Sequence, residues 1–331
     1  MSKILVTGGC GYIGSHTIVD LIENGYEIIS IDNFSNSNPL VLEKIYEITG
    51  KKVINYNIDL KDLNSLFNIF KNNDILSIIH FAAFKSVPES VNNPVEYYDN
   101  NINGLLNLLK MCRDFNIQKF IFSSSCSIYG TPKDVPVSEK TLISPESPYA
   151  STKYFCEEII KDFSKISKTK FISLRYFNPI GAHNSLKIGE TTKSINVLSR
   201  IVATYKGEQD KLLIFGSDWP TKDGTCIRDY IHVSDVAEAH RVSLIKNFYK
   251  NFTSINIGTG KGHSVLELIG IFEKMSGEKL NYEIVDRRPG DVSEIWSDIS
   301  YSEEIIDWKA NRTIEESVYS HLMYSKNLKN C

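Results

Sequence analysis

The chain lacks the features of nucleic-acid-binding, disulfide-rich, metal-binding and membrane proteins. Its 331 residues include 37 Lys and Arg and 40 Asp and Glu, and a net charge of −3 gives no reason to expect a polyanion as partner. The six cysteines are scattered without a C-x-x-C pair, and the seven histidines show no H-x-x-x-H spacing. There is no apolar run of about 18 residues or more. We therefore expect a cytoplasmic protein that binds no nucleic acid, no membrane and no metal.

What the chain does contain is an alternation of short apolar runs and longer amphipathic segments. Apolar runs at 4–7, 27–31 and 75–81 are typical of buried strands, and the segments between them are typical of helices. This alternation favours an α/β fold with a doubly wound, Rossmann-like parallel sheet, followed by a smaller α/β substrate-binding domain. The expected domains are 1–178, which would bind the cofactor, and 179–331. A segment near 228–258 is expected to pack back onto the first domain.

A glycine-rich turn follows the first apolar run. Gly8, Gly11 and Gly14 form a G-x-x-G-x-x-G pattern at the start of a predicted helix, and Asp32 ends the next predicted strand. Glycines at these positions let the backbone approach a pyrophosphate, and the helix N-terminus supplies N–H donors. Asp32 would accept hydrogen bonds from the adenosine ribose and repel a 2′-phosphate, so we predict NAD rather than NADP as cofactor. A second glycine-rich segment, 258–262, lacks the P-loop spacing and is predicted to be a turn between a strand and a helix.

A second pattern suits proton transfer. Tyr149 and Lys153 form a Y-x-x-x-K pair on one face of a predicted helix that begins near Ser147. A lysine ammonium, together with the positive nicotinamide ring of NAD, would favour the phenolate and make Tyr149 a general base. The strand 120–123 leads into a serine-rich segment. Its Ser125 hydroxyl would lie at the carboxyl end of a central strand, where ligands of open α/β sheets bind.

These motifs resemble those of the extended short-chain dehydrogenase/reductase family. Further segments narrow the resemblance to the UDP-galactose (UDP-glucose) 4-epimerases. They are Asp32-Asn33, His80 to Val87, Tyr97 to Asn101, and Arg228 to Val233, whereas Arg175 to Pro179 resembles the wider family. The resemblance extends from the first predicted strand to about Trp308.

The resemblance implies an NAD-dependent isomerase that inverts the 4-hydroxyl of UDP-glucose or UDP-galactose through a transient 4-keto sugar, with NAD tightly bound. Tyr149 would take the proton from the 4-hydroxyl, Ser125 would assist, and Lys153 would hold the nicotinamide ribose. The implied NAD-binding residues are Gly8, Gly11, Tyr12, Ile13, Gly14, Asp32, Asn33, Asn36, Ser37, Asp59, Phe81, Ala82, Lys85, Asn100, Tyr149, Lys153 and Tyr176. The implied substrate-binding residues are Ser125, Phe177, Asn178, Asn196, Arg228, Arg288, Asp291 and Ile295. Family members commonly form homodimers through two long helices, which here would be the segments 95–116 and 149–165.

Two departures from the family leave the sugar open. Segment 195–200 reads I-N-V-L-S-R where the family usually carries N-N-L-M-P-Y, which bears on the uracil-side contacts. Ile295 stands where a tyrosine restricts the pocket to UDP-glucose and UDP-galactose and where small residues admit N-acetyl sugars. Its intermediate size makes UDP-GlcNAc and UDP-GalNAc candidate substrates, and UDP-xylose is a further alternative.

Two other activities fit the sequence less well. A nucleotide-sugar 4,6-dehydratase would place an Asp-Glu pair at the strand end, where this chain has Ser125-Cys126-Ser127. A non-catalytic NAD-sensing regulator would be expected to lose Tyr149 or Lys153, and both are present.

Overall fold

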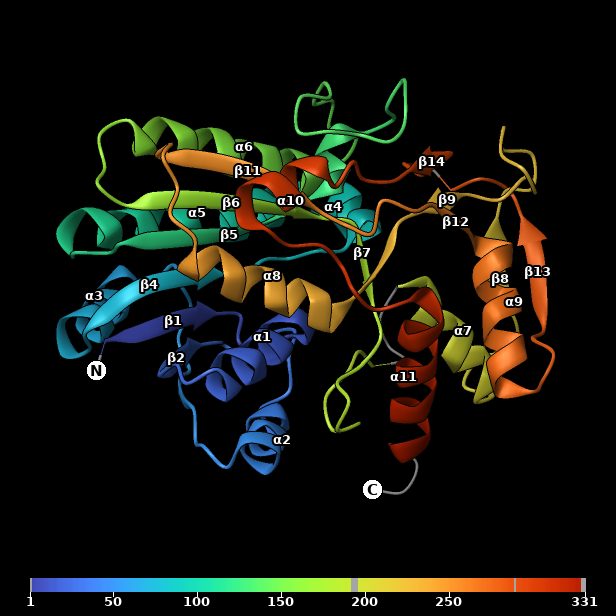
Figure 1. Ribbon diagram of the computed structural model, residues 1–331, viewed down its shortest axis with the longest axis horizontal. Coiled ribbons are helices and arrows are strands. Elements are labelled where there is room, and N and C mark those ends of the chain that lie inside the picture. Colours follow the sequence, from blue (N-terminus) through green and yellow to red (C-terminus); the bar gives the residue numbers. More distant parts are fainter. Residues whose placement is uncertain (1, 192–195, 289, 329–331) are drawn as a thin grey trace. The chain divides into compact units, whose positions relative to one another are not determined.

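The computed structural model describes residues 2–191, 196–288 and 290–328 (Figure 1). These residues form two compact units. Unit 1 comprises Met1–Ile128, Ile143–Tyr176 and Ala237–Ile255, and unit 2 comprises Tyr129–Leu142, Phe177–Val236 and Asn256–Cys331. Residues 129–142 lie within the range 1–178 that we expected for the first domain, but they group with unit 2.

Unit 1 is built on a seven-stranded sheet of order β11-β6-β5-β4-β1-β2-β3. Its strands are β1 (Lys3–Thr7), β2 (Ile28–Ile31), β3 (Ile54–Tyr56), β4 (Ile75–His80), β5 (Lys119–Ser125), β6 (Lys170–Tyr176) and β11 (Phe252–Ile257). All neighbouring pairs from β3 to β6 are parallel. The strand order reverses between β1 and β4, and ligands of such sheets bind at the carboxyl ends of the strands beside this switch point. The predicted doubly wound fold is confirmed.

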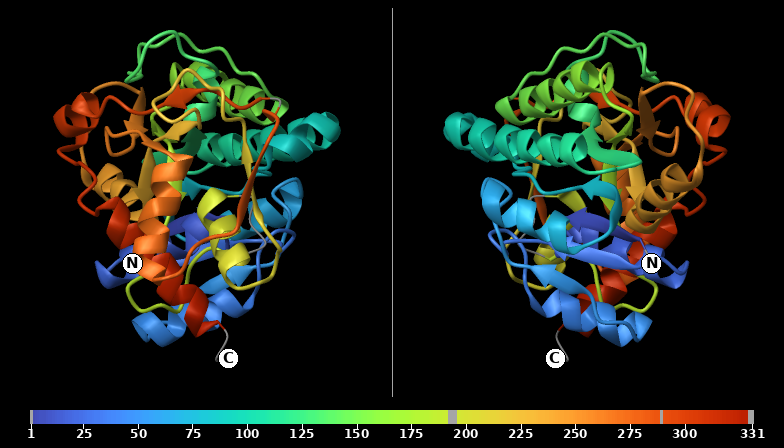
Figure 2. Two further views of the ribbon diagram at one scale, coloured as in Figure 1. Left: turned by 90° about the vertical axis from the view of Figure 1, so that its right-hand side faces the viewer. Right: turned by 90° about the vertical axis from the view of Figure 1, so that its left-hand side faces the viewer.

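Helices cover both faces of this sheet. They are α1 (Tyr12–Glu23), α2 (Leu40–Thr49), α3 (Leu63–Asn72), α4 (Val87–Asn92), α5 (Pro94–Asp114), α6 (Pro148–Ser164) and α8 (Val233–Ile245). Figures 1 and 2 show α5 and α6 side by side on one face, and Figure 1 shows α1 and α8 on the other. On the α5–α6 face, Leu66 of α3, Leu105 of α5 and Ile160 of α6 belong to one buried cluster with Phe120 of β5. This core fixes the strand ends against the helices that carry the candidate site.

The helix boundaries follow local signals. The Ser147 hydroxyl accepts a hydrogen bond from the Ala150 N–H, and Pro148 occupies the first turn, so α6 begins where the sequence predicted. The predicted helix 95–116 starts slightly earlier, at Pro94, and is preceded by the separate helix α4. Proline disfavours helical backbone at the residue before it, so Asn93 separates the two helices.

The described residues of unit 2 combine short strands with helices. Its strands are β7 (Asn178–Ile180), β8 (Leu212–Phe215), β9 (Ile227–Arg228), β10 (Tyr230–His232), β12 (His263–Ser264), β13 (Tyr282–Val285) and β14 (Glu294–Ile295). They form the pairs β10-β7 and β13-β8 and the three-stranded sheet β12-β9-β14. The helices are α7 (Val197–Tyr205), α9 (Val265–Ser276), α10 (Ser300–Ile306) and α11 (Ile314–Asn327). Residues of α7, α9 and α11 share a buried apolar cluster with β8.

Candidate active site

The glycine-rich turn has the geometry of a phosphate-binding loop. Gly8 has a positive φ of 70°, and a Cβ on it would lie 2.7 Å from the Ala82 backbone nitrogen. A Cβ on Gly14 would lie 2.2 Å from the Gly8 carbonyl oxygen. Both positions therefore need glycine for the protein's own packing. Gly11 differs, because its φ of −75° suits any residue and its nearest potential clash is 3.3 Å away.

The absence of a side chain at Gly11 instead keeps the start of α1 open. Gly11 is the N-cap and contributes no side-chain hydrogen bond to the helix. The first N–H groups of a helix have no partner within it, and Tyr12, Ile13 and Gly14 are the first residues of α1. The turn therefore presents backbone donors and the positive end of the helix dipole to an anion.

Asp32 is held at the end of β2 by the protein itself. Its carboxylate accepts hydrogen bonds from the Cys10 N–H at 2.9 Å, the Phe34 N–H at 2.9 Å and the Ser37 hydroxyl at 2.7 Å. The carboxylate thereby ties the phosphate turn to the loop after β2. Burial, with the Asp32 charge, raises the pKa of the Cys10 thiol to about 12, so that cysteine stays protonated at neutral pH.

Other predicted NAD residues surround the same strand ends. Asn33 and Asn36 are exposed in the loop after β2, and Asp59 follows β3 and accepts the Lys61 N–H at 2.8 Å. Lys85 is exposed in the loop after β4.

The loop after β4 is anchored by a residue that sequence reasoning did not assign. Asn101 accepts a hydrogen bond from the Phe84 N–H at 2.8 Å and donates to the Phe84 carbonyl at 3.1 Å and the Thr152 hydroxyl at 3.0 Å. The predicted Asn100 donates to the same side chain at 3.0 Å. Asn101 therefore joins this loop to α6, and its signal was the Asn-Asn pair in α5.

The catalytic candidates lie together in unit 1. The side chains of Tyr149 and Ser125 share a hydrogen bond. The Lys153 ammonium is buried, donates to the Ser123 carbonyl at 2.7 Å and lies 5.9 Å from the centre of the Tyr149 ring. The predicted hydroxyl, phenol and ammonium thus converge at the carboxyl end of β5.

Burial dominates the charge states of this group. It lowers the pKa of Lys153 to about 8, against the charges of Cys156 and Glu157, which raise it. Burial raises the pKa of Tyr149 to about 12, although the Ser125 hydrogen bond lowers it. In the chain alone, Lys153 does not bring the pKa of the Tyr149 phenol toward neutrality. The prediction relied also on the positive nicotinamide ring of NAD, and it stays a prediction. The desolvation of the phenolate outweighs the lysine, whose ammonium points at a backbone carbonyl.

Aromatic rings border the neighbouring strands. Phe81, at the end of β4, packs on His240 with ring centres 4.7 Å apart, and Tyr176, at the end of β6, packs on the same histidine at 5.6 Å. The resemblance implied an NAD-binding role for Phe81, and the contact of its ring here is with α8. Ala82 lies against Gly8 and limits the width of the turn.

In unit 2, the first substrate candidates follow the end of β6. Phe177 is buried, and its N–H donates to the Ile257 carbonyl at 3.2 Å. Asn178 begins β7, and its N–H donates to the Asp229 carbonyl at 2.9 Å. Arg228 occupies β9, where it is paired in register with Ile295 of β14 and His263 of β12. Ile295 is buried.

Asp229 organises the second glycine-rich segment. Its buried carboxylate accepts hydrogen bonds from the Thr259 hydroxyl at 2.6 Å and the Ser297 hydroxyl at 2.7 Å, and from the Gly260 N–H at 3.2 Å. The segment 258–262 connects β11 to β12 and α9, as predicted. Its hydrogen bonds hold Asp229, which directly follows Arg228 in the chain.

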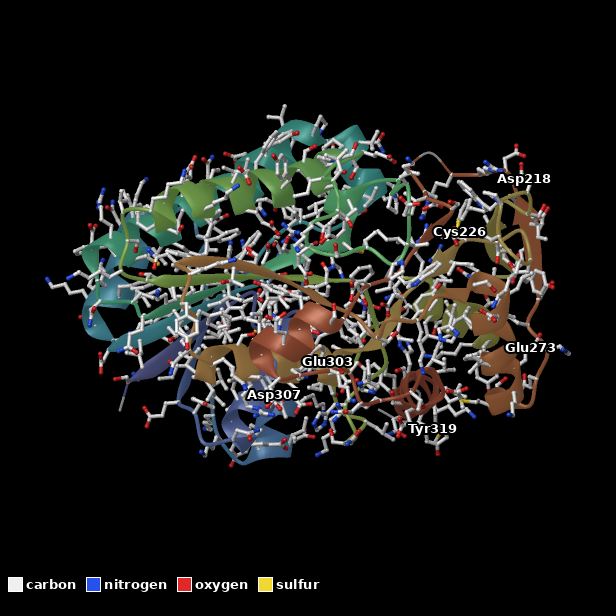
Figure 3. The ribbon with its side chains drawn as sticks, turned by 45° about the horizontal axis from the view of Figure 1, so that its top comes forward. Asp218, Cys226, Glu273, Glu303, Asp307 and Tyr319 are labelled. Carbon is white, nitrogen blue, oxygen red and sulfur yellow. The ribbon has the colours of Figure 1, made fainter. Side chains whose placement is uncertain are left out.

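Two arginines extend from the loop after β13. Arg288 donates to Asp291 at 2.8 Å and lies 5.0 Å from the centre of the Phe215 ring, and Asp291 is 4.0 Å from Arg228. Arg287 stacks on Trp219 at 4.1 Å and donates to Asp218 at 2.7 Å; Asp218 is labelled in Figure 3. Phe215 was not among the predicted site residues, because no motif distinguished it from an ordinary strand residue.

Asn196 caps α7 instead of lying within it. Its side chain accepts the Leu198 N–H at 3.2 Å and donates to the Pro179 carbonyl at 2.8 Å, next to Asn178. The predicted helix from residue 195 therefore begins at Val197. Ile195 and the loop residues just before it lie outside the described part of the chain.

Within the described ranges, no group of three His, Cys, Asp or Glu side chains is arranged to hold a metal ion. The same ranges contain no helix long and apolar enough to cross a membrane. Among the described cysteines, Cys10, Cys112, Cys156 and Cys226 are free thiols.

Known proteins resemble this chain over nearly its whole length. Residues 5–320 match the family model described as GDP-mannose 4,6 dehydratase. A UDP-glucose 4-epimerase of Drosophila melanogaster is 44% identical over 326 residues, which are 95% of this chain and 93% of the relative.

Solved structures agree with this grouping. The UDP-glucose 4-epimerase of Bifidobacterium longum in complex with NAD+ and UDP is 41% identical, with a TM-score of 0.95 and 99% of each chain covered. The UDP-Glc/GlcNAc 4-epimerase of Campylobacter jejuni is 35% identical, with a TM-score of 0.84 and coverage of 99% and 100%. The resemblance predicted from the sequence is confirmed: the chain belongs to the GDP-mannose 4,6 dehydratase family of extended short-chain dehydrogenases and groups within it with the UDP-glucose 4-epimerases.

Proposed function

We propose that the chain is an NAD-dependent isomerase that interconverts UDP-glucose and UDP-galactose by inverting the sugar at C4. The observation that carries the proposal is the convergence of Tyr149, Ser125 and Lys153 at the end of β5. It occurs in a chain whose relatives are named UDP-glucose 4-epimerases. In this proposal unit 1 holds NAD and unit 2 holds the UDP moiety.

The phosphate turn of unit 1 fits a dinucleotide. The open start of α1 offers backbone donors to a pyrophosphate, and the missing side chain at Gly11 leaves room for it. Three donors already occupy Asp32, and a carboxylate has about four acceptor sites. The remaining site would accept a ribose hydroxyl, and its negative charge would disfavour a 2′-phosphate. NAD therefore suits the turn better than NADP.

Bound NAD would supply the hydride acceptor at the sugar C4 and return the hydride to the opposite face. The protein's own task is to move the proton of the 4-hydroxyl. Tyr149 is assigned as the base because its phenol shares a hydrogen bond with Ser125 at the end of β5. Burial raises the pKa of this phenol in the chain alone, and the positive nicotinamide ring of bound NAD would favour the phenolate. Lys153 has a pKa of about 8 and is mostly protonated at neutral pH, so it holds a positive charge beneath the Tyr149 ring.

Unit 2 supplies groups suited to a nucleoside diphosphate. Arg228 and Arg288 both approach Asp291, and guanidinium groups bind phosphate oxygens through paired hydrogen bonds. Phe215 offers an aromatic face next to Arg288. We assign the phosphates and the uridine to these groups. The remaining assignments to the UDP-sugar are Phe177, Asn178, Asn196 and Ile295.

The proposal includes N-acetylhexosamines as second substrates. Ile295 is smaller than the tyrosine associated with strict glucose and galactose specificity, and the relative from Campylobacter jejuni is named a UDP-Glc/GlcNAc 4-epimerase. Turnover of UDP-GlcNAc to UDP-GalNAc would support N-acetylhexosamines as substrates, and turnover of UDP-glucose alone would contradict them.

A homodimer through α5 and α6 also belongs to the proposal. Apolar side chains remain exposed on these helices: Val95 is 72% exposed and Phe155 is 44% exposed, and Tyr98 lies 6.2 Å from Phe155 between ring centres. Light scattering on the purified protein should give the mass of two chains, and Phe155→Asp should halve it. A parent protein of single-chain mass would contradict the dimer. The free thiols of Cys10, Cys112, Cys156 and Cys226 fit a reducing cytoplasm, which we propose as the location.

The function is tested by incubating the purified protein with UDP-galactose under anaerobic conditions and resolving the products by NMR. The expected product is UDP-glucose, formed without added NAD because the cofactor is retained. A 4-keto-6-deoxy sugar would instead support a dehydratase. That outcome is not expected, because Ser125, Cys126 and Ser127 offer no carboxylate at the strand end.

A further inference from the structure

A buried ion pair lies behind the candidate catalytic strand end. Arg175 of β6 donates to Glu157 of α6 through Nε at 3.0 Å and through Nη2 at 2.5 Å. The side chains of Arg175 and Glu157 are only 5% and 3% exposed. Ser124 of β5 completes the group by donating its hydroxyl to Glu157 at 2.5 Å.

Burying two charges is costly, and such a pair often contributes nothing to stability relative to apolar residues of similar volume. The contribution of the Arg175–Glu157 pair then depends on which residues it holds in place. The register of the sheet pairs Ser124 with Arg175 and the next residue, Ser125, with Tyr176. The ion pair therefore lies one residue from Ser125, on the opposite side of the alternating strand.

Helix α6 contacts the end of β5 at two consecutive residues. Lys153 donates to the Ser123 carbonyl at 2.7 Å, and Glu157, one turn later, accepts from the Ser124 hydroxyl. Tyr149 lies one turn before Lys153 on the same face of the helix. The two contacts fix the distance between the helix that carries the phenol and the strand that carries the Ser125 hydroxyl.

We propose that Glu157, held by Arg175, is a positioning residue that uses Ser124 to set Ser125 against Tyr149. Neither member of the ion pair has the exposure needed to touch a ligand, so it acts through the strand end. This inference rests on the proposed function, because the geometry that it maintains is that of the proton transfer.

The test is Ser124→Ala, which removes the hydroxyl from the strand end and leaves the Arg175–Glu157 pair intact. The matched control is Ser173→Ala, on the neighbouring strand β6. Ser173 is equally buried, and its hydroxyl has no hydrogen-bond partner among the described residues. Each variant is assayed for kcat and KM with UDP-glucose and for its melting temperature by circular dichroism.

We expect Ser124→Ala to lower kcat by about 10-fold with KM changed by less than about 2-fold, because small displacements of reacting groups mainly affect the transition state. Ser173→Ala should keep the parent kcat. Equal kcat values in the two variants, with or without a lower melting temperature for Ser124→Ala, would overturn the inference, as would a change confined to KM. If the parent protein does not turn over UDP-glucose, the proposed function and this inference both fall.

Discussion

Adding one methyl group at either of two glycines in the phosphate turn should have different consequences: Gly14→Ala should lower stability, and Gly11→Ala should lower NAD affinity. In Gly14→Ala, the new Cβ would lie 2.2 Å from the Gly8 carbonyl oxygen and 2.9 Å from Gly9 Cα, so the backbone must move by roughly 1 Å to restore ordinary contact. Such overpacking costs about 1–3 kcal/mol. At about 2 kcal/mol, the melting temperature should fall by roughly 4–8 °C for a unit of this size.

In Gly11→Ala, the methyl group meets only the Gly8 carbonyl, at 3.3 Å, and the backbone angles suit alanine. Stability should stay within about 1 kcal/mol of the parent, since the lower entropy of the unfolded chain offsets the poorer cap. The methyl group instead occupies the space in front of the helix N-terminus. NAD affinity should fall at least about 10-fold, which corresponds to about 1.4 kcal/mol.

Each variant is the control for the other. Melting is followed by circular dichroism on protein stripped of nucleotide, and NAD binding is followed by calorimetry and by the NAD released per mole of protein on denaturation. A Gly14→Ala variant with the melting temperature of the parent, or a Gly11→Ala variant that binds NAD as tightly as the parent, would contradict these roles of the two glycines.

Three further predictions concern the catalytic group and the sugar. Tyr149→Phe should lower kcat by about 10²–10⁴ because it removes the general base, whereas Tyr154→Phe on the same helix should not; equal rates in steady-state assays would contradict the assignment. Burial lowers the pKa of Lys153 from 10.5 to about 8, so the unfolded chain binds more protons between these pH values and the stability of the parent gains with rising pH across that window. Lys153→Met removes the cost of burying the charged ammonium, which is up to about 3 kcal/mol of stability at pH 7. The variant should therefore melt at a higher temperature than the NAD-free parent, and this difference should shrink toward pH 10. A difference in melting temperature that does not change with pH would contradict a buried charge at Lys153. Ile295→Tyr should lower turnover of UDP-GlcNAc relative to UDP-glucose. If the ratio of kcat/KM for UDP-GlcNAc to kcat/KM for UDP-glucose stays unchanged, Ile295 does not select the sugar.

The parts that could be predicted from the sequence are those encoded locally. The glycine spacing, the acid at the end of β2 and the cap at Ser147 are all set within a few residues of the elements that they define. The sheet followed from the alternation of apolar runs and amphipathic segments, because buried parallel strands need continuous apolar residues.

The short strands of unit 2 could not be predicted in this way. Strand β9 has only two residues, and its partners are His263 to Ser264 and Glu294 to Ile295, far along the chain. Pairing of this kind depends on tertiary contacts that leave no periodic pattern in so short a segment.

Two element boundaries carry local signals that the predictions above do not include. Thr313 and Glu316 form a capping box at the start of α11, and Pro94 marks the break between α4 and α5. The pKa of Tyr149 is a different case, since its direction depends on how deeply the phenol is buried, and spacing in the sequence carries no measure of burial.

In the proposed reaction, the hydrogen removed from the sugar C4 returns to C4 on the opposite face, and bound NAD would supply the hydride acceptor. The most direct measurement uses UDP-glucose labelled with deuterium at C4, incubated with the protein in ordinary water and followed by NMR. We expect UDP-galactose that retains the deuterium at C4, because the transferred label would not exchange with solvent. Loss of the deuterium to water, or a product not inverted at C4, would contradict it.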